Sequence, residues 1–135
     1  MTIVEFVNAR LDEEEQAAEA ATPGKWGAQP GETGTLDNEW EVVAEGVTHV
    51  VYVGHEGGGV TTEENALHIA RHDPLRVLRE ITAKRQAVVE AKQANEFVSE
   101  RFRLPIENGA SGYLLRLIAA PYADHPDYDP AWTLT

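Results

Sequence analysis

The stretch "ALHIARHDPLRVLREI", residues 66–81, decides how the helical half of the chain is arranged. Asp73 and Pro74 interrupt it and form a favoured helix start, because aspartate caps free N–H groups and proline fits the first turn. The stretch therefore predicts a short helix over residues 61–72 and a long helix from 74 to about 102. The residues expected on the buried side of the long helix include Leu75, Leu78, Ile81, Val88 and Phe97.

The same stretch holds candidate ligand-binding residues. His68 and His72 lie one helical turn apart, a spacing at which two imidazoles can hold one metal ion. No carboxylate stands between them as in the zinc motif HExxH, so no metal is predicted. Arg71 and Arg76 flank the start of the long helix, where anions bind favourably. Three interpretations stay open, namely a structural join capped by Asp73, an anion site and a metal site. The ligand-binding candidates are Arg71, His72, Arg76 and His68.

An N-terminal helix is predicted over residues 3–20, where apolar side chains recur at helical spacing. Thr2 with Glu5 predicts a capping box at its start, and Thr61 with Glu64 predicts another for the short helix. "TPG" at 22–24 ends the N-terminal helix. Its apolar face comprises Ile3, Val7, Leu11 and Ala18.

A small antiparallel β-hairpin is predicted over about residues 35–54. "TLDNEWEVV" and "VTHVVYV" alternate in the manner of strands, and Glu45-Gly46 between them suits a tight turn. The glycine- and proline-rich residues 25–35 are predicted to form a loop. "GHEGGG" at 54–59 lacks the lysine and hydroxyl of a phosphate-binding loop, so it is predicted to be a flexible connection.

The end of the chain is predicted to be a last helix followed by an ordered irregular segment. "LPIENGASG" breaks the long helix, and "YLLRLIAA" continues as a helix up to Pro121. The segment 122–135 is too aromatic for a disordered tail, so it packs on the surface or meets a partner. Its partner-contact candidates are Tyr122, His125, Tyr128 and Trp132. The fold class predicted is α+β, mainly helical, as a single domain over 1–135 with its helical part at 61–121.

Charge is unevenly distributed along the chain. Lys and Arg number 11 against 23 acids, a formal net charge of -12. Up to residue 70 there are 14 acids and two bases, so the whole excess lies in the first half. An acidic half repels phosphate backbones, which excludes ordinary nucleic-acid binding. An acidic DNA mimic stays open as an alternative.

Composition excludes several further classes of protein. The chain has no cysteine, so disulfide frameworks, thiolate zinc sites and thiol nucleophiles are excluded. The N-terminus "MTIVEFVNARLDEEE" has no basic region typical of a signal peptide. No apolar run approaches the roughly 20 residues that span a bilayer. A cytoplasmic protein without membrane contact is therefore expected.

Three segments together resemble a known family. They are "ATPGKW" at 21–26, "ALHIARHDPLRVLREITAKR" at 66–85 and "LLRLIAAPYADHPDY" at 114–128. They are similar to a family of small uncharacterised proteins from actinobacteria and their phages, catalogued as a domain of unknown function. Its members usually have proline where this chain has Lys25. The resemblance implies an accessory function of a phage or mobile element, and it supplies no catalytic residues.

The function expected is therefore binding rather than catalysis. We expect a non-enzymatic phage or mobile-element accessory protein that binds a host or phage protein and forms a homo-oligomer. Neither catalytic residues nor a cofactor are predicted, because no nucleophile or carboxylate pair stands in a recognisable motif. The alternatives are sequestration of a small anionic, nucleotide-like ligand, DNA mimicry, and a metal-dependent enzyme.

Overall fold

The computed structural model describes residues 1–31, 39–54, 57–103 and 110–135. The chain divides into two compact units, one of residues 15–79 and one of residues 1–14 with 80–135. Here they are named the sheet unit and the helical unit, and each is described by itself. The predicted α+β, mainly helical fold is confirmed, whereas the single-domain organisation stays a prediction.

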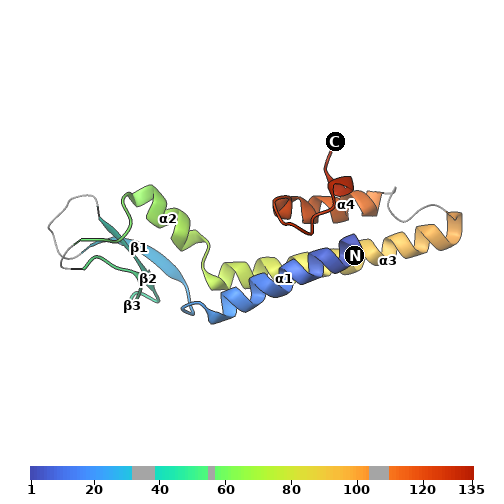
Figure 1. Ribbon diagram of the computed structural model, residues 1–135. Helices are drawn as coiled ribbons and strands as arrows, with labels where there is room; N and C mark the ends of the chain where they lie inside the picture. The colour runs from blue at the N-terminus through green and yellow to red at the C-terminus, as the bar shows by residue number, and fades with distance from the viewer. Residues whose placement is uncertain (32–38, 55–56, 104–109) are drawn as a thin grey trace. The chain divides into compact units, whose positions relative to one another are not determined.

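The helices and strands follow one another as Figure 1 shows. The helices and 3-10 turns are α1 (Ile3–Ala20), α2 (Glu63–Arg71), α3 (Pro74–Phe102), α4 (Ala110–Ala119), η2 (Ala120–Tyr122) and η3 (Pro130–Trp132). The strands are β1 (Trp26–Pro30), β2 (Trp40–Ala44) and β3 (Thr48–Val51). Residues 35–38 of the predicted hairpin, 55–56 of the glycine-rich loop and 104–109 of the helix break lie outside the described residues.

The sheet unit contains a three-stranded antiparallel sheet in the order β1-β2-β3. The predicted turn between β2 and β3 is confirmed: Glu45 and Gly46 have φ of 51° and 73°, and the Val47 N–H donates to the Ala44 carbonyl at 3.1 Å. Both central residues have positive φ, as a tight hairpin turn requires, and glycine adopts this conformation without strain. A register irregularity falls between Val42 and Val43.

The loop predicted over residues 25–35 is wrong at its start, because residues 26–30 form β1. Trp26 pairs with Ala44 and Pro30 pairs with Trp40 in the antiparallel register. Glycine and proline are poor strand formers, so the sequence pattern argued against a strand here. Hydrogen bonding to β2 overrides that local preference.

The core of the sheet unit lies between the sheet and α2, which packs against β1 and β2 (Figure 1). The cap of α2 is one residue later than predicted: the Thr62 hydroxyl, not that of Thr61, accepts the Asn65 N–H at 3.1 Å. The buried cluster comprises Val42, Val60, Ala66 and Ala70, with Trp26, Trp40 and Ile69 packed beside it.

In the helical unit, α3 pairs with the first turns of α1 through charged side chains. The predicted capping box of α1 is confirmed, since the Thr2 N–H donates to Glu5 and the Glu5 N–H donates to the Thr2 hydroxyl. An Arg85 Nη donates to an Asp12 carboxylate oxygen at 2.7 Å, and Lys84 lies 3.8 Å from Glu14. Acids of α1 thus face bases of α3.

The predicted buried side of α3 is partly correct. Ile81 and Val88 are 1% and 3% exposed, as predicted. The predicted burial of Leu75 and Phe97 is wrong, because these side chains are 45% and 62% exposed. The 3.6-residue period places apolar residues on a face, but it cannot show how far along a 29-residue helix a neighbour covers that face.

Candidate functional site

The join between α2 and α3 is held by the carboxylate of Asp73, which is 7% exposed. One oxygen accepts the Arg76 N–H at 2.8 Å, which is the predicted cap of α3. The other oxygen accepts the Trp26 N–H at 3.1 Å. A single side chain therefore caps a helix and fixes the start of β1, 47 residues away in sequence.

Replacing Asp73 with alanine is expected to lower the free energy of unfolding by about 2 kcal/mol, because a cap is lost and a second backbone N–H loses its acceptor. Chemical denaturation monitored by circular dichroism measures this. Asp73→Asn is the matched control: asparagine caps helices well, so its loss is expected to be smaller. Equal stability of Asp73→Ala and the wild type would contradict the joining role.

The histidine pair lies at the surface of the same join. The ring centroids of His68 and His72 are 4.5 Å apart, and the His72 Nδ1 donates to the His68 carbonyl at 2.7 Å. Both oxygens of Asp73, one candidate for a third metal ligand, already accept backbone N–H groups. Within the described ranges, no three His, Asp or Glu side chains converge on one metal position.

A pocket of about 380 Å³ opens beside the join, and we call it the basic pocket. Its walls come from the start of β1, the last turn of α2 and the first two turns of α3. Apolar side chains and one aromatic ring supply part of the lining. The basic pocket is lined by Lys25, Trp26, Gly27, Ala28, Leu67, Ala70, Arg71, Asp73, Leu75, Arg76 and Arg79.

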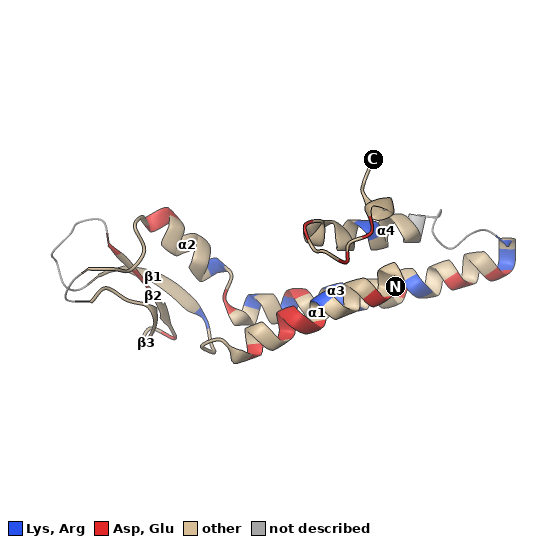
Figure 2. Ribbon diagram, in the orientation of Figure 1, with Lys and Arg blue, Asp and Glu red and all other residues tan. Residues whose placement is uncertain are grey.

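The charge of the basic pocket is opposite to that of the unit around it. The sequence of residues 15–79 contains eleven acids and four bases, a formal charge of -7. All four bases, Lys25, Arg71, Arg76 and Arg79, line the basic pocket. Figure 2 shows the corresponding blue segments at the start of β1, the end of α2 and the start of α3. Asp73 is the one acid among the lining residues.

Three of these cations form no ion pair within the described residues. In the part of the chain that the structure describes, no ion pair joins Lys25, Arg71 or Arg79 to an acid. Arg76 is anchored differently, since its guanidinium donates to the Arg71 carbonyl at 3.3 Å. Guanidinium groups are strong, bidentate donors to phosphate and carboxylate. The basic pocket therefore presents unused donors that suit an anion.

A family assignment follows from nearly the whole length of the chain. A model of a family of unknown function, DUF6221, matches residues 1–134. The chain belongs to the DUF6221 family. No curated protein and no solved structure matches it. The predicted membership of an uncharacterised family is thereby confirmed.

The structure of this DUF6221 chain separates the predicted ligand-binding candidates. Arg71 and Arg76 line the basic pocket, whereas His68 and His72 are not among its lining residues. Arg79 was not predicted as a site residue, although its place three residues after Arg76 on one helix face was a usable signal. Nor were Lys25 and Trp26, which only the pairing of β1 brings to α2 and α3.

The aromatic partner-contact candidates pack inside the helical unit of the DUF6221 chain. Four rings of the C-terminal segment surround Phe6 of α1, which is fully buried. Burial also raises the pKa of the Tyr122 hydroxyl, which therefore stays neutral. The centroid distances from Phe6 are 6.3 Å to Tyr122, 5.7 Å to His125, 5.8 Å to Tyr128 and 5.1 Å to Trp132.

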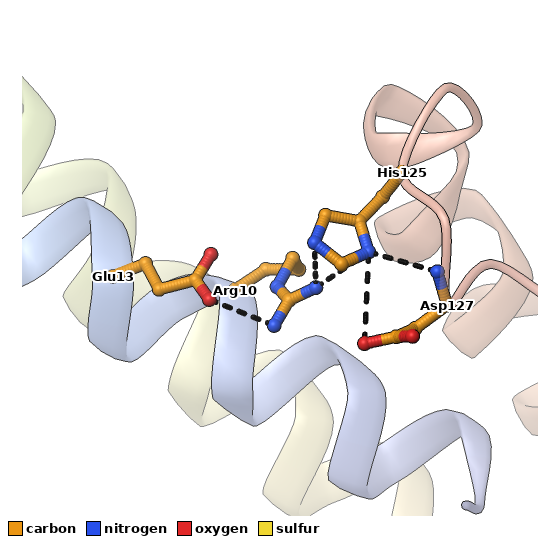
Figure 3. A network of polar contacts seen from close by, with 4 residues as sticks. All are labelled: Arg10, Glu13, His125 and Asp127. Atoms are coloured by element: carbon orange, nitrogen blue, oxygen red, sulfur yellow. Dashed lines mark hydrogen bonds and ion pairs between the residues drawn. The ribbon is translucent and has the colours of Figure 1, made fainter.

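A polar network accompanies these rings (Figure 3). Arg10 is 7% exposed, and it donates to Glu13 at 2.8 Å and contacts both ring nitrogens of His125. The Asp127 N–H donates to the His125 Nδ1 at 3.1 Å. Because a guanidinium only donates, His125 accepts from Arg10. The network fixes the C-terminal segment on α1, with its rings against Phe6.

Among the described residues of the DUF6221 chain, no helix combines the length and the apolar character required to cross a bilayer.

Proposed function

We propose that this protein binds a small polyanionic ligand in the basic pocket and acts by capturing it. One observation carries the proposal: all four bases of a unit with eleven acids line one pocket. The acids of this unit outnumber its bases nearly threefold. The placement of all four bases around one pocket therefore supports an anion-binding site. The guanidinium groups of Arg71 and Arg79, which form no ion pair with an acid among the described residues, supply the donors that an anion needs.

The surrounding acids do not prevent binding. Charges interact weakly beyond a Debye length of about 8 Å at physiological ionic strength, so the nearest groups decide the local potential. Asp73, the one acid of the lining, is held by two backbone N–H groups. Its carboxylate occupies the N-terminus of α3, so the anion is held by the side chains of the pocket instead.

Capture rather than chemistry is proposed because of what lines the pocket. Cations, apolar groups and an indole supply binding surface, and the histidines lie outside the lining. The phage or mobile-element setting implied by the family resemblance, and a cytoplasmic location, belong to the same proposal. In that setting the protein would withdraw an anionic metabolite or signal from its normal target.

Isothermal titration with inorganic tripolyphosphate tests the anion site. The wild type is expected to bind it, with affinity falling as salt rises, and Arg71→Ala and Arg79→Ala are each expected to weaken binding at least about tenfold. Asp73→Asn removes the acid of the lining and is expected to strengthen binding. Arg101→Ala is the matched control, because it makes the same charge change on an exposed part of α3 outside the pocket. An equal loss in Arg101→Ala would contradict a specific site.

We propose, as a second candidate, that the helical unit binds a protein partner. Large apolar side chains are exposed along the C-terminal half of α3 and on α4, and such surfaces are typical of interfaces. A homo-oligomer is the predicted form, and a host or phage protein is the predicted partner. The exposed residues are Val89, Phe97, Phe102, Tyr113, Leu114 and Leu117.

Light scattering tests the association. The wild type is expected to be at least dimeric at micromolar concentration, and a Phe97→Asp and Leu117→Asp double variant is expected to be monomeric, because charge opposes burial of that surface. Arg71→Ala is expected to leave the oligomeric state unchanged. A monomeric wild type at high micromolar concentration would contradict the association.

A further inference from the structure

The basic pocket has an aromatic wall as well as its cations. Trp26 lines it, and two hydrogen bonds fix this residue: the indole Nε1 donates to the Thr22 carbonyl at 2.9 Å, and the backbone N–H donates to Asp73. Trp26 is half-buried, so part of it remains exposed. A ring held in one orientation is a suitable stacking surface, because little freedom is lost on binding.

The strand next to Trp26 carries no side chain at Gly27, which is exposed and also lines the pocket. Apolar atoms of Leu67, Ala70 and Leu75 continue the lining. The pocket thus combines a cationic part with an apolar part that includes the Trp26 ring. A ligand that contacts both parts is expected to be anionic at one end and planar at the other.

We infer that the ligand is a mononucleotide, with its phosphates on the arginines and its base stacked on Trp26. This inference rests on the proposed anion site and names the ligand of that site. Bases stack on aromatic side chains with little dependence on sequence, whereas phosphates are bound bidentately by arginine. A volume of about 380 Å³ lies within the range of small-ligand sites and suits one nucleotide rather than a strand.

Titrations with ATP, UTP and inorganic tripolyphosphate test this inference on the full chain. ATP is expected to bind about tenfold more tightly than tripolyphosphate, and UTP between them, since the larger ring stacks more strongly. Trp26→Leu is expected to remove the advantage of ATP while keeping the affinity for tripolyphosphate. Trp26→Phe is expected to retain much of that advantage, because phenylalanine still offers a stacking ring.

A second variant avoids dependence on Trp26, which also packs beside the core. Leu75→Trp enlarges a lining side chain that is 45% exposed, and it is expected to weaken ATP binding at least about tenfold by occupying the pocket. Equal affinity of ATP and tripolyphosphate would overturn the nucleotide inference and leave the anion site standing. Failure of both ligands to bind would overturn both.

Discussion

Phe6→Ala is expected to lower the free energy of unfolding by roughly 3 to 5 kcal/mol, the usual cost of removing a buried phenylalanine. Phe6 is fully buried, and the rings of Tyr122, His125, Tyr128 and Trp132 pack around it. Its removal leaves a cavity that these rings cannot close without leaving their own contacts. Edge-to-face ring contacts add to the loss.

Urea denaturation followed by tryptophan fluorescence measures this effect. Phe97→Ala is the matched control in the same unit, because it makes the same chemical change at a side chain that is 62% exposed. Its cost is expected to stay below about 1 kcal/mol. Equal losses in the two variants would show that the C-terminal rings are not organised around Phe6.

Glu41→Ala is expected to cost about 3 kcal/mol, because it removes a buried carboxylate that three donors share. Glu41 is 3% exposed, and it accepts hydrogen bonds from Gln29 at 3.0 Å, the Val53 N–H at 3.1 Å and His49 at 3.2 Å. The variant leaves the Val53 N–H and the Gln29 amide without their acceptor. Glu64→Ala, on the exposed side of α2, is the control and is expected to cost less than about 1 kcal/mol.

The same carboxylate predicts a pH dependence. The hydrogen bond from Gln29 lowers the pKa of Glu41 most, burial opposes that shift, and the Val53 N–H and His49 lower the pKa further. A carboxyl with a lowered pKa stabilises the fold fully above its unfolded value of 4.5, and this contribution is lost as the pH falls below it. The stability difference between wild type and Glu41→Ala, measured from pH 7 to pH 3, is therefore expected to shrink below about pH 4.5. A constant difference would contradict ionisation of Glu41.

Local signals in the sequence predicted the helices well. Asp73-Pro74 and Thr2 with Glu5 specify helix starts through contacts within three residues, and those contacts are present. β1 could not be predicted, because "WGAQP" has weak strand propensity and its partner strand begins ten residues after it ends. Local preference was outweighed there by pairing in the folded chain.

Only part of the candidate site could be predicted from the sequence, because the rest depends on strand pairing. Arg71 and Arg76 lie within one stretch of sequence, so their proximity followed from helix geometry. Lys25 and Trp26 join them only because β1 pairs with β2 and the Trp26 N–H reaches Asp73. Contacts over 47 residues leave no periodic trace in a single sequence.

The bond between Trp26 and Asp73 also limits how far the sheet can grow. β1 is an edge strand of the sheet. Edge strands with unpaired N–H groups can pair with a strand from another copy and start aggregation. The Trp26 N–H is occupied by Asp73, and Pro30 at the other end of the strand has no N–H to offer. β3, the opposite edge strand, has four residues and an irregular register. Both edges of the sheet therefore discourage edge-to-edge polymerisation, so copies of the chain have to associate through other surfaces.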